Sequence, residues 1–355
     1  MAEIEKVMNI ALDDIEKLMN IGGDDIEKVN DLEYVTEVVW YGDRGLSIGG
    51  NHGNNEVIQY KAITSTGNMS DFADIGNYGS YGGIVRMATG SNKSRAVHTG
   101  GYGTNWNDDE TANAGDLNNI YYLTVGTLAD STDAADLTQA RDWIIGSTNG
   151  TRMLNCGGNE TPFDIVDYFA IASISNASDF GDLYAATMSM VGSINNATRA
   201  VIGTGYTDAD TNGTGRMDYF SYASTGDASD FGDMTAAGGQ RLGNQGLGGV
   251  ENATRGLLMG GQDSASSDYR DYILYITVDT TGNATDFGDL IAVVRGGYGN
   301  QVTGNAIKGE AYGYTTAAGS GQDNIQSMTI ASTGNAADNG NLLGTNSYNG
   351  AVSGT

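Results

Sequence analysis

The sequence predicts an all-β fold, a six-bladed β-propeller preceded by a short helical N-terminal anchor. The chain has 54 glycines, 20 tyrosines and one proline in 355 residues, a composition typical of many short strands joined by tight turns. A unit of about 50 residues recurs along most of the chain, as expected for propeller blades. A different repeat of 11 residues occupies the N-terminus. We therefore divide the chain into a docking segment, residues 1–33, and a propeller, residues 34–355.

The docking segment reads IEKVMNIALDD, IEKLMNIGGDD and IEKVNDLEYVT. Asp14 and Asp25 suit helix N-caps and Gly22 and Gly23 suit helix ends, so we expect one or two helical turns in each copy. Such a short segment cannot bury its own apolar stripe, and we expect it to attach the protein to a partner or to copies of itself. A loosely helical leader without a binding role is the alternative. The residues expected to make the attachment are Ile4, Val7, Met8, Ile15, Leu18, Met19 and Ile26.

The first landmark of the propeller repeat is a basic residue that opens a glycine-containing strand. It occurs in RGLSIGG, RAVHTGG, RMLNCGG, RAVIGTG, RGLLMGG and KGEAYGY, which begin at Arg44, Arg95, Arg152, Arg199, Arg255 and Lys308. These six copies predict six blades, each with its second strand at the landmark.

The second landmark is an aromatic residue followed eight positions later by Asn or Asp. The pairs are Tyr60 with Asn68, Tyr122 with Asp130, Tyr168 with Asn176, Tyr219 with Asp227 and Tyr275 with Asn283, and in the sixth copy Ser327 precedes Asn335. Six residues further stand Asp74, Asp136, Asp182, Asp233, Asp289 and, in the last copy, Asn341. Because this internal spacing is constant while the linkers vary, we expect a repeated fold with variable loops.

The strand at which the repeat begins and the strand at which it ends predict how the ring closes. The chain enters the propeller at Arg44 with a second strand, so the first blade lacks an inner strand. The segment NSYNGAVSGT is left over after the sixth copy. We expect Asn349–Ser353 to pair with Arg44–Gly50, because this pairing leaves no inner edge exposed.

These units resemble the kelch repeat family, whose blades carry a strand ending in Gly-Gly, a strand with Tyr, a turn and an aromatic residue on the outer strand. The phenylalanines that stand where kelch usually has Trp are Phe72, Phe180, Phe231 and Phe287. The sequence departs from the family at Ala135 and Asn339, which take this place in copies two and six. Copies four and six also lack the Gly-Gly pair. The resemblance implies four-stranded blades over nearly all of residues 37–355.

The outer-strand motif contains Asp-Phe-Gly, the triplet with which protein kinases hold magnesium. The triplet recurs with the repeat, and the other kinase motifs are absent from the sequence. We therefore predict that Phe287 packs between blades and that Gly288 permits a close backbone approach.

Charge and composition exclude several classes of partner. The net charge of −27 repels phosphate backbones and anionic lipids, so we expect no nucleic acid and no membrane insertion. The acidic N-terminal sequence is not a secretory signal, which favours synthesis in a cytoplasm. Cys156 has no partner for an intrachain disulfide and is expected to be a buried strand residue. The Asn-x-Ser/Thr triplets, as at Asn196 and Asn252, follow the repeat and are expected to make turns.

Few residues are available for catalysis. His52 and His98 lie in neighbouring units, so we expect no zinc, copper or iron site, no enzymatic activity and no cofactor apart from calcium. Asp208, Asp210 and Asn212 imitate part of an EF-hand loop without its closing Glu, which predicts a calcium site; a solvated acidic loop is the alternative.

Two long loops, Gly101–Asn119 and Gly205–Gly215, follow second strands and should emerge on one face. Loops on a rigid scaffold commonly carry binding residues. The residues expected to bind a ligand there are Tyr102, Trp106, Asp108 and Asp109.

Repeats such as TIASTGNAADNGNL and leaders such as IEKVMNI resemble tail-fibre, neck and other appendage proteins of bacteriophages, particularly marine ones. The resemblance implies a viral structural protein, made in the host cytoplasm and displayed on the virion surface. Its N-terminal segment would bind other virion proteins, and its propeller would recognise a host-surface receptor or glycan. A carbohydrate-active propeller enzyme and a cellular kelch-type interaction module are the alternatives.

Overall fold

The chain forms two compact units, Met1–Val39 and Trp40–Thr355. The structure is a computed structural model, and in the first unit it describes only the backbone of four short strands. In the second unit it describes residues 42–50, 57–75, 84–106, 112–158, 164–187, 190–205, 213–236, 238–263, 268–295, 300–316 and 318–354.

In the first unit the described residues are strands where helical turns were expected. β1 (Lys6–Val7) pairs with β2 (Ile10–Ala11), and β3 (Lys28–Val29) pairs with β4 (Leu32–Glu33), at equivalent positions of the first and third 11-residue copies. The helical anchor is therefore not confirmed. Segments this short nucleate helix poorly, whereas Val and Ile favour strands and a two-residue separation suits a hairpin.

Of the residues expected to make the attachment, Val7 lies in β1. The others lie outside the described residues: Ile4, Met8, Ile15, Leu18, Met19 and Ile26.

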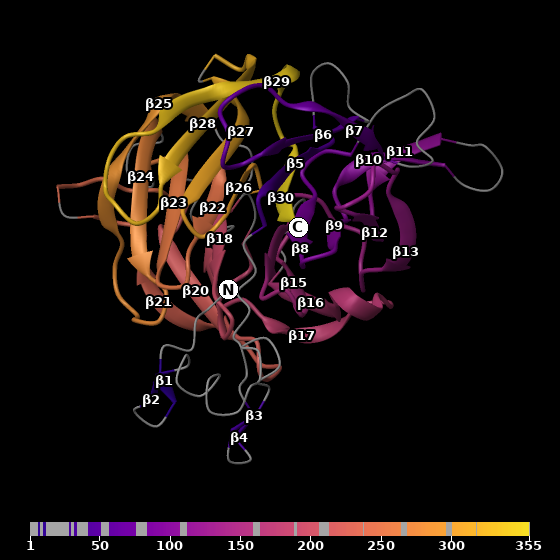
Figure 1. Cartoon of the computed structure of the whole chain (residues 1–355), viewed down its shortest axis with the longest axis horizontal. Coiled ribbons are helices and arrows are strands. Elements are labelled where there is room, and N and C mark those ends of the chain that lie inside the picture. Colours follow the sequence, from indigo (N-terminus) through magenta and orange to yellow (C-terminus); the bar gives the residue numbers. More distant parts are fainter. Residues whose placement is uncertain are drawn as a thin grey trace. The chain divides into compact units, whose positions relative to one another are not determined.

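The second unit is all-β and propeller-like, with its sheets arranged around a common centre (Figure 1). Four of the sheets have four strands each. The first sheet contains β30 (Gly350–Gly354), β5 (Arg44–Ile48), β6 (Val57–Ala62) and β7 (Ser70–Asp74). The second contains β8 (Ala88–Ser91), β9 (Arg95–Thr99), β12 (Asn119–Thr124) and β13 (Thr132–Asp136). The third contains β14 (Ile145–Thr148), β15 (Arg152–Cys156), β16 (Ile165–Ala170) and β17 (Ser178–Asp182). The fourth contains β18 (Gly192–Asn195), β19 (Arg199–Gly203), β20 (Arg216–Ser221) and β21 (Ser229–Asp233).

A fifth sheet has eight strands and consists of two runs of four. The first run is β22 (Gly248–Glu251), β23 (Arg255–Gln262), β24 (Tyr269–Thr277) and β25 (Thr285–Arg295). The second run is β26 (Val302–Gly304), β27 (Lys308–Thr316), β28 (Gly321–Thr329) and β29 (Ala337–Asn346). The runs join where Val294 and Arg295 of β25 pair with Thr316 and Thr315 of β27. This junction is possible because β25 has 11 residues, against five in β21, and extends past the end of its own run.

We call the first-named strand of each four-stranded sheet and of each run the inner strand. The inner strands meet at the centre. They contact one another in the cyclic order β30, β8, β14, β18, β22, β26 and again β30. β30 comes from the C-terminus and pairs with β5, with Gly350 opposite Ile48 and Ser353 opposite Gly45. The predicted pairing of the chain's end with Arg44–Gly50 is confirmed, so the first sheet combines both ends of the propeller sequence.

The basic landmark joins neighbouring sheets or, at Arg255, the two runs of the eight-stranded sheet. The Arg199 guanidinium carbon lies 4.6 Å from the ring centroid of Tyr219 in its own sheet, and Nη1 donates a hydrogen bond of 3.1 Å to the carbonyl of Val278 in the next sheet. Lys308, in the copy where Ser327 takes the place of the tyrosine, donates to the carbonyl of Ile63 at 2.9 Å. The other basic landmarks donate to carbonyls in the same way: Arg44 to Val125, Arg95 to Ile171 and Ala172, Arg152 to Tyr222, and Arg255 to Ile330 and Ala331.

The Asn or Asp landmark makes a second set of bonds between sheets and between the two runs of the eight-stranded sheet. The backbone N–H near the end of each outer strand donates to the landmark side chain of the next sheet or run. The pairs are Asp74 to Asp130, Asp136 to Asn176, Asp182 to Asp227, Asp233 to Asn283, Asp289 to Asn335 and Asn341 to Asn68. The last pair connects the eight-stranded sheet back to the first sheet, so this set of bonds also runs round a closed cycle.

The Asp-Phe-Gly triplet is structural, as predicted. Phe287 is 3% exposed and lies in a core cluster with Leu257 of β23 and Met328 of β28. A Cβ atom on Gly288 would lie 2.4 Å from the carbonyl oxygen of Gly334, so a side chain there would collide with the next turn. The Asn-x-Ser/Thr triplets form turns, as at Asn196, whose Oδ1 accepts the backbone N–H groups of Thr198 and Arg199.

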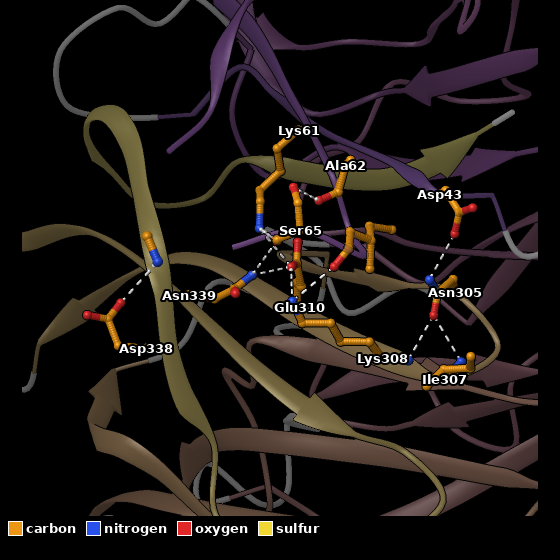
Figure 2. Close-up of polar contacts among 12 residues, drawn as sticks. Asp43, Lys61, Ala62, Ser65, Asn305, Ile307, Lys308, Glu310, Asp338 and Asn339 are labelled. Carbon is orange, nitrogen blue, oxygen red and sulfur yellow. Dashed lines mark hydrogen bonds and ion pairs between the residues drawn. The ribbon is translucent and has the colours of Figure 1, made fainter. Parts of the chain in front are cut away.

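A buried polar network lies where the last run meets the first sheet (Figure 2). Glu310 of β27 is fully buried and accepts hydrogen bonds from Lys61 Nζ at 2.9 Å, from the Tyr312 hydroxyl at 2.9 Å and from the Asn339 amide. Lys308 Nζ lies 3.1 Å from the same carboxylate. Burial lowers the pKa of Lys61, and its contacts with Glu310 oppose this shift. We call Lys61, Glu310 and Asn339 the seam network.

The seam network replaces an apolar cluster found at other junctions. Between the third and fourth sheets the equivalent residues are Leu154, Phe180 and Phe220, and the two phenylalanine rings meet edge to face at 5.7 Å. At the junction of the last run with the first sheet, polar residues thus occupy all three positions that are apolar between the third and fourth sheets.

We expect Lys61→Met to destabilise the propeller by about 3–5 kcal/mol, because it leaves the Glu310 carboxylate buried without its main partner. The triple variant Lys61→Phe/Glu310→Leu/Asn339→Phe copies the junction of the third and fourth sheets and should recover most of that loss. Thermal and urea unfolding of the variants would measure both effects. A single variant as stable as the triple variant would contradict this account.

Candidate functional site

The variable loops define one face of the second unit. We call it the upper loop face: it consists of the connections between second and third strands and the connections between successive runs. In the loop Gly101–Asn119, β10 (Tyr102–Trp106) pairs with β11 (Ala112–Asp116) to form a hairpin (Figure 1). This face therefore carries an element that the repeat itself does not require.

The residues predicted to bind a ligand or a metal are distributed as follows. Tyr102 is 39% exposed at the base of the hairpin, and Trp106 lies at the end of β10. The remaining ones lie outside the described residues: Asp108, Asp109, Asp208, Asp210 and Asn212. The structure thus places one predicted side chain, that of Tyr102, within a larger cluster.

This cluster consists of Arg86, Tyr102, Asp142, Trp143 and Tyr348, and we call it the ring-mouth cluster. Arg86 Nη1 donates to Asp142 Oδ2 at 2.7 Å, and the Asp142 side chain is 1% exposed. The guanidinium carbon lies 5.0 Å from the ring centroid of Trp143 and 5.6 Å from that of Tyr102. A buried carboxylate therefore orients a half-buried arginine that two aromatic rings flank.

Three members of the cluster have a left-handed backbone. The φ angles of Arg86, Trp143 and Tyr348 are 60°, 53° and 62°. They are also joined, since the Arg86 N–H donates to the Tyr348 carbonyl at 3.1 Å and the Trp143 N–H donates to the Arg86 carbonyl at 3.0 Å. This conformation costs a non-glycine residue roughly 1–2 kcal/mol and is rare for bulky ones. Such strain concentrates at functional sites, where the surrounding structure maintains it.

Each of these three residues stands two positions before an inner strand, namely β8, β14 or β30. Their side chains are thereby presented at the upper ends of three neighbouring inner strands. Because those strands meet at the centre, the cluster lies beside the mouth of the ring.

Amide side chains close the ring next to the cluster. The Asn300 side chain donates to the Ile144 carbonyl at 2.8 Å and accepts the Gly146 N–H at 3.4 Å. The backbone carbonyl of Asn300 accepts the Ala351 N–H at 2.7 Å. Asn300 precedes β26, so these bonds connect three different sheets across the centre. Gln301 Nε2 also donates to Asn349 Oδ1 at 2.8 Å. These buried amides bond to the segments that directly follow Trp143 and Tyr348, so they fix the backbone next to the cluster.

Glu251 is the one acidic residue of the inner strands. It ends β22 at the lower side of the ring, and burial raises its pKa to about 8, while a hydrogen bond from the backbone of Asn195 opposes the shift. Within the described ranges no three His, Cys, Asp and Glu side chains gather as they would around a metal ion.

The residues considered for redox or metal chemistry are buried. Cys156 is fully buried in β15, as predicted, and burial raises its thiol pKa to about 12. His98 is fully buried, stacks on Tyr121 with ring centroids 4.9 Å apart, and burial lowers its pKa to about 3. Both side chains serve as packing residues in this structure. His52 lies outside the described residues.

Sequence reasoning identified Tyr102 and missed Arg86, Asp142, Trp143 and Tyr348. These residues lie in connections whose lengths vary between copies. Counting from the landmarks therefore did not bring them to equivalent positions. A usable signal was present all the same: a bulky residue stands two positions before the small-residue strands ATGS, IGST and GAVSG.

No family model matches the sequence, and none of the curated proteins is similar to it. Among solved structures, one described as the structure of YjhT is similar, with a TM-score of 0.54 at 11% sequence identity. The likeness covers 79% of this chain and 92% of that chain. At this identity it supports the propeller-like fold and nothing finer. No helix within the described part of the chain is long and apolar enough to cross a membrane.

We expect Glu251→Gln to raise the melting temperature above pH 8 and to change it little near pH 4. In the folded protein the pKa of the Glu251 carboxyl is about 8, whereas in the unfolded chain it has the ordinary value of 4.5. Stability is therefore lost as the pH rises between these values, and glutamine removes the loss. The gain at pH 9 should be at least about 1 kcal/mol, which for a unit of this size is a shift of roughly 1–2 °C. Scanning calorimetry from pH 4 to pH 9 tests this, and an equal gain at both ends of the range would contradict it.

Proposed function

We propose that the protein is a non-enzymatic recognition propeller that binds a host-surface glycan through its upper loop face. The observation that carries this proposal is the ring-mouth cluster. It combines aromatic faces, a fixed guanidinium and strained backbone at one place, and its side chains are not those of the repeat landmarks.

The chemistry of the cluster suits a sugar. A pyranose ring has apolar C–H faces and a rim of hydroxyls. The faces can pack on Trp143 and Tyr102, and the hydroxyls can bond to the Arg86 guanidinium. Preformed sites of this kind, largely apolar with a few placed polar groups, are typical of small-ligand recognition.

We also propose that the eight-stranded sheet represents two blades, so that the propeller has six. Three repeating features support this count. The basic landmark bonds to a neighbouring carbonyl in six copies, the Asn or Asp landmark accepts a backbone N–H in six copies, and the inner strands form a cycle of six. Pairing of Val294 and Arg295 with the next run would then be an added link between blades five and six.

For the whole protein we propose a role as a virion appendage whose first unit attaches it to other virion proteins or to further copies. The support is the resemblance of the repeats and the leader to phage appendage proteins, together with the division of the chain into two compact units. Display on the virion surface would place the upper loop face where a host glycan could reach it.

We expect the full chain to bind at least one glycan on a glycan array, and Trp143→Gly to weaken this binding at least tenfold. Glycine removes the aromatic face but adopts a φ of 53° without strain, so the melting temperature should fall less than in Trp143→Ala. Lys93→Gln, in a lower turn, is the matched control and should bind as the wild type does. A folded protein that binds no glycan, or a Trp143→Gly variant with unchanged binding, would refute the proposed function.

We expect a chain that starts at Trp40 to remain folded and to lose its attachment. Melting temperature and circular dichroism should match those of the full chain, because the landmark bonds lie in the second unit. Co-purification with virus particles, or the oligomeric state by light scattering, should be lost. A truncated protein that still joins particles or oligomers would show that the first unit is not the attachment element.

A further inference from the structure

We infer that the glycan recognised by the upper loop face is acidic, a polysaccharide bearing carboxylate or sulfate groups. This inference rests on the proposed function and names its ligand class. It follows from the positions of the arginines in this strongly acidic protein.

Most basic residues of the second unit serve the fold. The basic landmarks bond to neighbouring sheets, and Lys61 and Arg141 are buried in ion pairs with Glu310 and Asp167. Lys93 occupies a lower turn. The remaining basic residues are all arginines, and all lie in connections or strand ends of the upper loop face: Arg86, Arg216, Arg241, Arg270 and Arg295. In a chain of net charge −27, every arginine of the second unit apart from the landmarks and Arg141 thus lies on the face that carries the variable loops.

Three of these arginines each lie beside an aromatic ring and bond to at least one carboxylate. Besides Arg86 in the ring-mouth cluster, the Arg216 guanidinium lies 4.9 Å from the ring centroid of Tyr184 and bonds to Asp218 at 2.7 Å. Tyr184 is 68% exposed, whereas the Asp218 side chain is fully buried.

The third of these sites has Arg270 at its centre. Its guanidinium lies 5.8 Å from the ring centroid of Tyr272 and pairs with Asp263 at 3.3 Å and with Asp268 at 3.1 Å. Each of the three sites therefore offers a positioned guanidinium beside an aromatic ring.

A positioned guanidinium is suited to a carboxylate or sulfate. Arginine has five N–H donors in a planar fork, and the described ion pairs of Arg86 use Nη1 alone. The buried partners Asp142 and Asp218 orient the group from the protein side, so the outward donors need little ordering when an anion binds. The flanking rings favour a sugar over a bare anion, because they pack on its apolar faces.

The net negative charge does not prevent this binding at physiological salt. The Debye length there is about 8 Å, so repulsion from distant carboxylates is screened while contacts with the arginines remain. The charge instead restricts an acidic ligand to the places where the arginines stand, because elsewhere the surface repels it.

The test compares two matched pairs of polymers on the full chain: polygalacturonate with its methyl ester, and dextran sulfate with dextran. Biolayer interferometry at 0.15 M salt would measure the affinities. We expect at least one acidic polymer to bind tenfold more tightly than its neutral counterpart. Arg270→Gln, whose partner Asp268 is 65% exposed, and Arg86→Gln should each reduce this preference several-fold, while Lys93→Gln should not.

Each outcome has a distinct meaning. Equal or tighter binding of the neutral polymers overturns the acidic ligand and leaves the proposed glycan function standing. A loss in Lys93→Gln as large as in Arg270→Gln also overturns the inference, because the preference would then reflect general charge. Absence of binding to both pairs overturns the acidic ligand, and absence of binding on the glycan array as well removes the proposed function itself.

Discussion

Closure of the ring is the constraint on which the rest of the structure depends. A row of sheets around a centre has two ends, and each end would expose unpaired backbone groups unless they meet. Here the C-terminal strand β30 pairs with β5, and Asn341 bonds to Asn68 as Asp289 bonds to Asn335. The junction of the two ends thus repeats the contacts made between sheets along the chain.

The same constraint explains why so much of the fold could be predicted from the sequence. A contact that recurs between every pair of neighbours leaves a residue type at a constant spacing. Asp233 with Asn283 is such a contact between sheets, and Arg199 with Tyr219 is its counterpart within a sheet; all four residues stand at constant spacings in the sequence. The C-terminal inner strand could also be placed, because the repeat is cut in a way that leaves one strand over.

The candidate site could not be predicted in this way, because three of its members share a position before an inner strand but not a residue type. Arg86 and Trp143 take part in it through left-handed backbone angles and one buried carboxylate, in connections of unequal length. The first unit shows the opposite difficulty. Its 11-residue period fitted a helix, yet Lys6–Val7 pairs with Ile10–Ala11, because a period alone does not decide between a short helix and a hairpin.

The seam network shows how a nearly symmetric ring can still have a defined order. If every junction carried the apolar cluster of Leu154, Phe180 and Phe220, the last run could pack equally well on several sheets. Lys308 of the same run lies beside the buried Glu310 carboxylate, and only the right junction adds a second cation: among residues at this position Lys61 alone is basic, the others being Leu123, Phe169, Phe220, Ile276 and Met328. The desolvation of Glu310 therefore penalises every wrong junction more than the right one, which trades some stability for a unique closure. A ring closed in one order also places Tyr348, Arg86 and Trp143 on adjacent inner strands, so the geometry of the ring-mouth cluster depends on the same junction.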